Sequence, residues 1–382
     1  MLKKAARTAP SLFECVGEGC LRPPQSREGP TALILDCGDL TKHPYFVGLD
    51  VHKQIIAYCV KKVDGQLVTE GTIKATRTAL AEWVKSLPQP WVGGMEATMF
   101  SHWIYVALQP HAAELYMGHA ARMKAISAGK KKSDKLDSRT IADLLRCNVF
   151  PKCFVIAPEL GRLRQQLRFR QLVVKQQVAF MNKTAGLLME TGIEYERRRL
   201  HGKRYFSELM ATTHWVNQEL KPLLKFSRQQ IESLAGMDKR LIRMLEKHPQ
   251  LRARVAALRT IEGVGPILAL SWALETGTPE RFPSIKDAQS YCGLTSAFWE
   301  SAGQQKRRPL SKQRNQHLQT VLIEVANLAP LYNEKLKALY QKEKAAGADS
   351  NQATLEVARK LVAYLLAVDR AFWRSAQLKR AA

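Results

Sequence analysis

The sequence predicts an α/β domain with a mixed sheet, followed by a run of helices that forms the rest of the chain. Two observations carry this prediction. β-rich segments alternate with short helical ones between Tyr45 and Phe150, whereas apolar residues recur at helical spacing from Pro158 onward. The 382 residues suffice for two or three domains at roughly 100–200 residues each. We expect a leader over 1–43, the α/β domain over 44–155, a helical arm over 156–250 and a mostly helical C-terminal domain over 251–382.

The elements of the α/β domain follow one another along the chain. Residues 45–75 contain β-rich runs on both sides of Asp64-Gly65, a turn dipeptide typical of a hairpin. We then expect a helix over 78–86, a strand over 91–95, a helix over 102–108 and a strand over 113–117. Residues 1–43 hold Pro, Gly and Cys without a period, which indicates a poorly ordered leader or a start codon placed too far upstream.

The arm is predicted from apolar residues at steps of three, four and seven, the spacing of a coiled coil. The first run contains Leu160, Leu163, Leu167, Val174, Met181 and Leu188, and the second contains Ile231, Leu234, Leu241 and Leu245. Between them lies a basic bend, Arg197-Arg198-Arg199. Two long helices joined there would form an antiparallel coiled-coil arm, and an ordinary helical bundle fits the same periodicity. The C-terminal domain is expected to end in an amphipathic helix over 354–373.

Charge is the most informative feature of the composition. The chain has 59 Lys and Arg against 34 Asp and Glu, a net charge of +25, so a polyanion is the expected partner and nucleic acid comes first. No apolar run approaches the ~18–20 residues of a membrane helix, which excludes an integral membrane protein. The start lacks the apolar region of a secretory signal, and the seven cysteines form no CxxC pair. We therefore expect a cytoplasmic protein with reduced thiols.

Four carboxylates in the α/β domain are candidate metal ligands. Asp50 ends the first strand run, Glu96 follows the Gly93-Gly94 strand, and Asp134 and Asp137 lie three residues apart on one helix face. Hard cations such as Mg²⁺ prefer oxygen ligands, and one or two such ions can polarise a phosphodiester. The alternative is that Asp134 and Asp137 only suit the dipole at a helix start capped by Ser133.

Basic residues surround the acidic pair. They are Arg122, Lys124, Lys130, Lys131, Lys132, Lys135 and Arg139. At the bend of the arm, Arg197, Arg198 and Arg199 are further candidate contacts to nucleic acid. Cations beside metal-binding acids suit a phosphate-backbone substrate. A solvated basic loop is the alternative interpretation.

Two further motifs lie in the C-terminal domain. Gly263-Val264-Gly265-Pro266 sits between two helical segments in the manner of a helix–hairpin–helix, where backbone N–H groups can approach a phosphate, although a plain interhelical turn fits equally. Ser301 precedes a cation-rich stretch that contains Lys306, Arg307, Arg308 and Lys312. A serine hydroxyl among cations can attack a phosphodiester, but a lone serine is usually structural. Ser296 and Ser311 are rivals, with Ser311 expected to cap a helix.

Taken together, GLDVHK, GGMEAT, KSDKLDSR, IEGVGP, YCGLT…ESAG and SK-x-x-N-x-x-L resemble the DEDD transposases of the insertion-sequence 110 family, including its 1111 branch. The resemblance covers the chain from about Tyr45 to the C-terminus. It implies a RuvC-like domain of the ribonuclease-H type, a coiled-coil insertion used in oligomerisation, and a C-terminal transposase domain. It also implies a partner DNA duplex, a structured guide called bridge RNA, and a dimer or tetramer associated with the nucleoid of a prokaryote.

The resemblance assigns roles to single residues. The family's DEDD residues match Asp50, Glu96, Asp134 and Asp137, with Mg²⁺ as cofactor, and its nucleophilic serine matches Ser301. Three residues depart from the family pattern near this serine, namely Ser296, Glu300 and Arg314.

Three functions remain in competition. The first is a recombinase that forms a serine–phosphate intermediate. The second is a metal-dependent Holliday-junction-type endonuclease that uses water, and the third is a nucleic-acid-binding protein with decayed catalysis.

Overall fold

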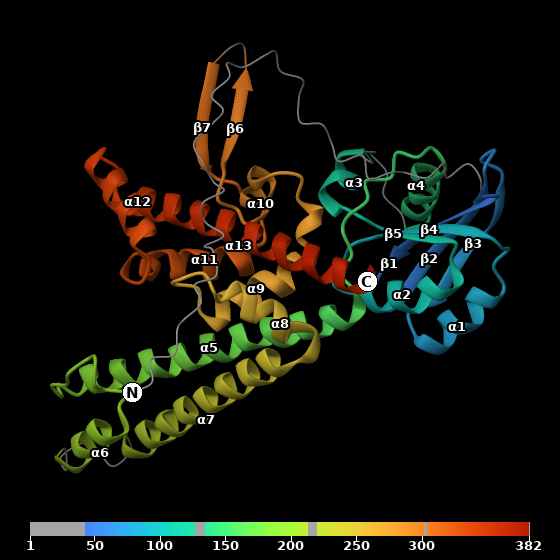
Figure 1. Cartoon of the computed structure of the whole chain (residues 1–382). Coiled ribbons are helices and arrows are strands. Elements are labelled where there is room, and N and C mark those ends of the chain that lie inside the picture. The colour runs from blue at the N-terminus through green and yellow to red at the C-terminus, as the bar shows by residue number, and fades with distance from the viewer. Residues whose placement is uncertain (1–42, 127–133, 213–219, 302–303, 382) are drawn as a thin grey trace, which may run out of the picture.

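The computed structural model describes residues 43–126, 134–212, 220–301 and 304–381. Its first domain is built on a five-stranded mixed sheet with the order β3-β2-β1-β4-β5 (Figure 1). The strands span Tyr45–Val51 (β1), Ile55–Lys62 (β2), Leu67–Lys74 (β3), Trp91–Glu96 (β4) and Glu114–Gly118 (β5). The three N-terminal strands run antiparallel, and β4 and β5 add in parallel, so the expected mixed sheet is confirmed. Asp64-Gly65 forms the turn after β2, with Gly65 at φ +89°.

Helices cover both faces of this sheet. Alternate residues of β1 point to opposite sides, so Val47 and Leu49 pack in one core and Phe46 packs in the other. The first core also contains residues of α1 (Arg77–Lys85) and α2 (Ser101–Leu108). The second contains residues of α3 (Ala120–Ile126) and α4 (Asp134–Arg146).

Helix α4 lies unusually close to the central strand. A Cβ added at Gly48 would stand 2.1 Å from the carbonyl oxygen of Ser138 and 2.5 Å from the amide nitrogen of Ala142. Both are backbone atoms of a helix, which cannot move aside as a flexible side chain can. Gly94 on β4 faces the same way, since a Cβ there would stand only 3.0–3.1 Å from side-chain atoms of Leu145 and Phe150, closer than ordinary van der Waals contact. The absence of a side chain at position 48 therefore sets the distance between α4 and the sheet.

The arm is a pair of long antiparallel helices, α5 (Pro158–Glu190) and α7 (Leu220–Lys247), with α6 (Lys203–Thr212) near its far end (Figure 1). The predicted heptad residues Leu163 and Leu167 are buried, together with Leu245 of α7. They share one core with the C-terminal helices, so the base of the arm is part of that core. A separate small core, which includes Leu188, holds the far end together.

The C-terminal part is mostly helical, as expected. It contains α8 (Pro249–Leu258), α9 (Pro266–Thr276), α10 (Ile285–Tyr291), the hairpin β6 (Ser296–Ser301) and β7 (Gln304–Leu310), α11 (Gln316–Leu328), α12 (Glu334–Ala345) and α13 (Ser350–Ala381). The terminal helix α13 begins four residues before the predicted span 354–373 and ends eight residues after it. At the centre, the guanidinium of Arg254 donates to both oxygens of Asp369, at 2.8 and 2.6 Å, and Trp272 donates to the same carboxylate. Across the described ranges, no helix has the length and apolar character to span a membrane.

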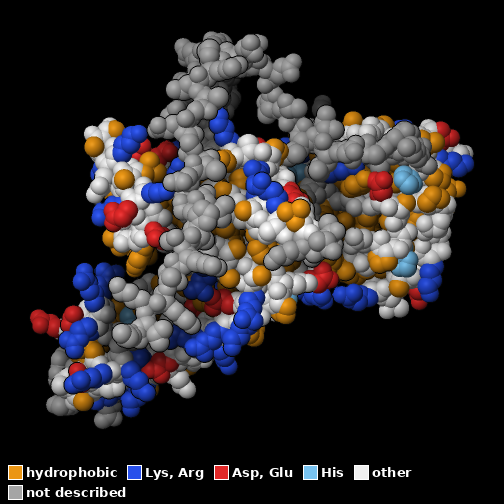
Figure 2. All heavy atoms as spheres, in the orientation of Figure 1, with side chains coloured by type: hydrophobic (Ala, Val, Ile, Leu, Met, Phe, Trp, Pro, Cys, Tyr) orange, Lys and Arg blue, Asp and Glu red, His pale blue; other side chains and the backbone are white. Residues whose placement is uncertain are grey.

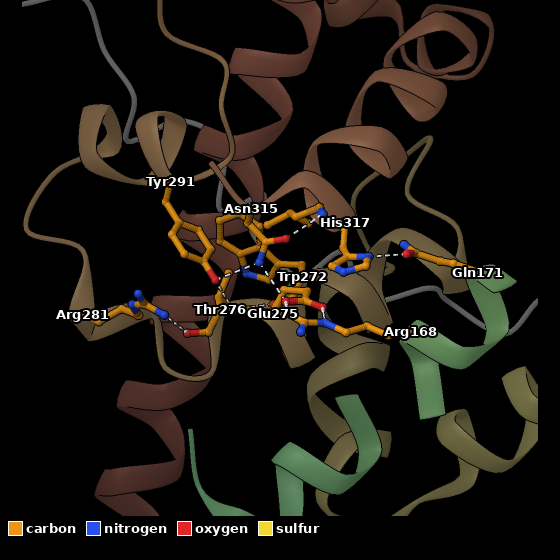
Figure 3. Close-up of polar contacts among 10 residues, drawn as sticks. Arg168, Gln171, Trp272, Glu275, Thr276, Arg281, Tyr291, Asn315 and His317 are labelled. Atoms are coloured by element: carbon orange, nitrogen blue, oxygen red, sulfur yellow. Dashed lines mark hydrogen bonds and ion pairs between the residues drawn. The ribbon is translucent and has the colours of Figure 1, made fainter. Parts of the chain in front are cut away.

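A polar junction on Glu275 joins the arm to the C-terminal helices (Figure 3). Arg168 of α5 donates twice to this buried carboxylate, at 2.8 and 2.7 Å. Asn315 donates to it at 2.8 Å, and its side-chain oxygen also accepts from the amide of Leu318, which caps α11. Tyr291 completes the group by donating to the backbone oxygen of Glu275.

The position of this cap corrects one expectation. Ser311 does not cap a helix, because α11 begins only at Gln316 with Asn315 as its cap. Its hydroxyl instead accepts from the amide of Gln313 in a turn. The asparagine of the SK-x-x-N motif is thus both a helix cap and a partner of Glu275, which fixes the segment that follows the hairpin.

We predict that Gly48→Ala destabilises the first domain. The new methyl group would overlap backbone atoms of α4, and overpacking of this kind costs about 1–3 kcal/mol. Urea denaturation measures the change. Gly186→Ala in α5 is the matched control, because nothing lies within 4 Å of that position and alanine favours the helix by up to about 1 kcal/mol. Equal stability of Gly48→Ala and wild type would show that α4 is free to shift.

A second prediction concerns the pH dependence of stability. Burial alone would raise the pKa of Glu275, but the hydrogen bonds and charge of Arg168, with help from Asn315, hold it below its ordinary value of 4.5. The stabilisation from a lowered carboxyl pKa is complete above that ordinary value and is lost as the pH falls through the folded-state value. Glu275→Gln should therefore lower the free energy of unfolding by about 3 kcal/mol at neutral pH.

The difference between Glu275→Gln and wild type should narrow progressively below pH 4.5, as measured by urea denaturation across a pH series. The exposed Glu262, in the same domain, provides the control Glu262→Gln, for which we expect little change. A difference that stays constant with pH would mean that Glu275 does not titrate as its surroundings require.

Candidate catalytic pocket

A pocket of about 680 Å³ opens at the carboxyl ends of β1 and β4, beside α4. Asp50, Glu96 and Asp137, three of the four predicted carboxylates, line it. They come from three separate elements, the two strand ends and the first turns of the helix. Ligand sites in open sheets occur at such strand ends.

The strand register explains why the first two carboxylates meet. β1 and β4 are parallel neighbours in which Leu49 pairs with Met95, so Asp50 and Glu96 occupy the next position on each strand. Both lie two residues beyond a glycine that faces α4, and alternation along a strand therefore turns them toward α4 as well. Because Gly48 lets α4 approach, Asp137 on that helix reaches the same pocket.

Asp50 is the most buried of these acids, with 8% of its surface exposed. One of its oxygens lies 3.0 Å from Nε2 of His52, whose side chain is half exposed. His52, Lys53 and Lys124 also line the pocket. His52 was not among the site residues predicted from the sequence, although its place two residues after Asp50 in GLDVHK was the available signal.

The donor set of the pocket suits a hard divalent cation, because carboxylate oxygens are the ligands that Mg²⁺ prefers. Within the described residues, no three His, Cys, Asp or Glu side chains are close enough together to hold a metal ion. Asp134 is the first residue of α4, and its side chain lies outside the described part. The convergence of all four carboxylates on one metal site therefore stays a prediction.

The predicted basic residues near the pocket fall into two groups. Lys130, Lys131 and Lys132 lie outside the described residues, as does the side chain of Lys135. Arg139 donates twice to Glu70 of β3, at 2.6 and 2.7 Å, and this contact holds its pKa above the ordinary value.

A second ion pair between the sheet and α4 joins Lys61 of β2 to Asp143 at 2.6 Å. Burial works to raise the pKa of Asp143, yet hydrogen bonds from Lys61 and Arg146 leave it lowered. Arg139 and Asp143 thus both tether α4 to the sheet, and the Arg139 side chain that we assigned to nucleic acid has an acidic partner within the chain.

Ser301 is the last residue of β6, paired across the hairpin with Gln304. Its side chain and those of Lys306, Arg307 and Arg308 are outside the described set. Lys312 is exposed at the base of the hairpin. In Figure 1 the hairpin rises from the C-terminal helices, and its free end stands apart from the sheet. The end of β6, where Ser301 lies, is therefore apart from the sheet whose strand ends line the pocket.

The remaining predicted phosphate contacts are in turns. Gly263 has φ +88° and packs against Ala329, so the fold itself requires this glycine, whereas no atom lies within 4 Å of a Cβ at Gly265, which precedes α9. Arg197, Arg198 and Arg199 are exposed at the far end of the arm, where Arg199 pairs with Glu196.

Two family models match the chain. A model described as "Transposase", for the DEDD transposases of IS110 elements, matches residues 47–193, which include the pocket and α5. A model described as "Transposase IS116/IS110/IS902 family" matches residues 255–341, which include the hairpin. Together they cover more than half of the chain.

Curated relatives agree with these models. The "Probable family 20 transposase" of Pseudomonas aeruginosa is 26% identical over 284 residues, 72% of this chain and 81% of the relative. The "Putative transposase y4qE" of Sinorhizobium fredii is 23% identical over 365 residues, 85% of this chain and 88% of the relative. The "Transposase for insertion sequence element IS1328" of Yersinia enterocolitica is 22% identical over 74% of this chain and 83% of its own. From the two models and the fold, the chain belongs to the IS110 family of transposases and is a DNA transposase.

Proposed function

We propose that this transposase excises and inserts its mobile element by cleaving and rejoining DNA strands at a carboxylate centre with a serine nucleophile. The carboxylates are Asp50, Glu96, Asp134 and Asp137, and the nucleophile is Ser301. A structured guide RNA selects the DNA, and the active form is a homo-oligomer. The observation that carries the proposal is that Asp50, Glu96 and Asp137, which are far apart in sequence, line one pocket.

The carboxylates would hold one or two Mg²⁺ ions, which when bound supply positive charge that stabilises a phosphate under attack. The residues of the chain have their own tasks. His52 orients the Asp50 carboxylate through their 3.0 Å contact, and Lys53 and Lys124 line the same pocket, where their charges attract the DNA backbone.

Ser301 would form the covalent link. Its Oγ attacks the phosphorus, the bond from phosphorus to the 3′-oxygen breaks, and that oxygen leaves as a 3′-hydroxyl with a proton. The serine–phosphate ester keeps the energy of the phosphodiester, so a new 3′-hydroxyl can reverse the step and restore Ser301. The separation of the β6–β7 hairpin from the sheet in Figure 1 supports an arrangement in which Ser301 of one copy works beside the carboxylates of another.

One of the departures from the family pattern, Arg314, is accommodated by the fold. Arg314, which replaces a family glycine, packs over Gly293, where a Cβ would approach its side chain to 2.6 Å. Its guanidinium donates to the carbonyl of Ser311. The segment after the hairpin thus accommodates the arginine, because position 293 has no side chain.

A water-dependent junction endonuclease is the second candidate, since the pocket alone supports it. In that case Ser301 is structural, and the pocket residues position the attacking water. A covalent protein–DNA adduct separates the two functions.

We predict that Asp50→Asn abolishes strand cleavage. Loss of the several kcal/mol that a bound metal contributes would slow cleavage by about three orders of magnitude or more. Binding should stay nearly unchanged, because affinity comes mainly from Lys and Arg. Strand cleavage is measured with labelled element-end DNA, guide RNA and Mg²⁺, and DNA affinity is measured by gel shift. Glu82→Gln, an exposed carboxylate on α1, is the control. Normal cleavage by Asp50→Asn would remove the carboxylate centre from the mechanism.

Ser301→Ala should eliminate an adduct that survives detergent and disappears with protease. The measurement uses wild type, Ser301→Ala and Ser296→Ala with the same labelled DNA, guide RNA and Mg²⁺. Wild type and Ser296→Ala should form the adduct at equal levels. An adduct retained by Ser301→Ala would make Ser296 the next candidate, and cleavage by wild type without any adduct would favour the endonuclease.

A further inference from the structure

Helix α7 of the arm has an exposed face of Lys and Arg side chains that, within the part of the chain that the structure describes, make no contact needed to hold the fold together. Five exposed cations lie on it, Lys225, Lys239, Arg240, Arg243 and Lys247. At 100° per residue they fall within an arc of about 100°. The buried residues Leu224, Ile231 and Leu245 lie outside this arc. Leu224 packs with residues of α5 in the small core at the far end of the arm, and Leu245 packs in the core at its base. We call the five residues the cationic face of α7.

The acids of α7 are paired with cations other than these five, although one of them, Glu232, falls within the arc at 100° per residue. Glu232, Asp238 and Glu246 are the acidic residues of the helix, and each is already engaged. Arg228, Arg170 and Arg259 are their respective partners. Among the described residues, none of the five cations of the face forms an ion pair, so their charges remain available to an external anion. Figure 2 shows Lys and Arg side chains gathered along the arm.

Gly236 is a second, independent sign that something approaches this face. It lies near the middle of the arc, and no atom of the chain lies within 4 Å of a Cβ built there. A glycine inside a helix costs about 0.5–1 kcal/mol relative to alanine, and no neighbouring group requires it here. A glycine at the centre of a cationic helix face allows a backbone of opposite charge to come close.

The shape and composition of the face favour a duplex over a single strand. From Lys225 to Lys247 the helix rises about 33 Å at 1.5 Å per residue, close to one duplex turn of about 34 Å. The arc carries no aromatic residue on which the bases of a single strand could stack. Phe226 lies outside the arc and meets Phe180 of α5 edge-on, with ring centroids 6.0 Å apart.

We propose that the cationic face of α7 binds the phosphate backbone of duplex DNA. The arm then holds DNA outside the carboxylate pocket and without reading its sequence, since charges on a straight helix recognise phosphates and not base edges. The surface is separate from the chemistry of the pocket, so its test needs binding alone and stands whether or not the chain cleaves DNA.

The test compares two triple variants of the full chain with equal reduction of charge. One carries Arg240→Gln, Arg243→Gln and Lys247→Gln. The control carries Lys286→Gln, Lys342→Gln and Lys344→Gln, which are exposed residues of the C-terminal helices. Fluorescence anisotropy with a 30-base-pair duplex DNA gives Kd over a series of salt concentrations, and circular dichroism checks that both variants fold.

We expect the α7 variant to bind about 10- to 100-fold more weakly at physiological salt. Its slope of log K against log salt should fall in magnitude by about 0.9 for each phosphate that the variant no longer neutralises. The control should stay within about twofold of wild type. Equal weakening of both variants would mean that only overall charge matters, and no weakening of either would mean that the face does not touch DNA. Each result would overturn the proposal.

Two further measurements sharpen the result. Leucine favours the helix more than glycine does, so Gly236→Leu should leave α7 folded. The variant should weaken DNA binding, because the leucine side chain keeps the DNA backbone away from the helix. Wild-type affinity in this variant would contradict the close approach. An RNA duplex of the same length is titrated in parallel, and a dependence on α7 that appears with RNA but not with DNA would overturn the choice of partner.

Discussion

The geometry of the candidate pocket depends on the contact of α4 with the central strand at Gly48. The space for one methyl group is missing there, with helix backbone atoms 2.1 and 2.5 Å from where a Cβ would stand. A helix that lies this close delivers its first turns to the carboxyl end of β1, where Asp50 is. The ion pairs of Arg139 with Glu70 and of Lys61 with Asp143 then hold the outer side of α4 to β3 and β2. Asp137 therefore lines the pocket because a glycine permits the approach and two ion pairs fix its orientation.

The Glu275 junction has a similar role between the arm and the C-terminal helices. A carboxylate buried almost completely needs compensating charge and hydrogen bonds, and it receives them from Arg168 on α5 and Asn315 at the start of α11. Asn315 follows the hairpin that carries Ser301, and Tyr291 precedes it. Arg168 at the base of the arm and Asn315 after the hairpin are thus bound to the same carboxylate.

The distribution of charge separates two kinds of cation. Arg139, Arg168 and Arg254 face acids of the chain and hold elements together. The cations on the outer face of α7 have no such partner among the described residues, while the acids of that helix are occupied elsewhere. Some of the Lys and Arg residues behind the large net positive charge therefore stabilise the fold through ion pairs, and others remain available to bind phosphate. Counting Lys and Arg cannot distinguish the two, because the distinction lies in which acids are near in space.

The sequence by itself determined the order of the elements, because β-rich runs and heptad patterns are local properties. It also placed Asp50, Glu96 and Asp137 at strand ends and on a helix face, where the structure has them. The sequence also contains the family motifs. The physical role of the asparagine in SK-x-x-N is visible only in the structure, where Asn315 caps α11 and donates to Glu275. Tertiary structure alone decided that Leu163 and Leu167 join the C-terminal core, that Arg139 faces Glu70, that His52 meets Asp50, and that the β6–β7 hairpin stands apart from the sheet. These facts depend on contacts between residues distant along the chain, and distances of that kind follow from packing, which no local pattern encodes.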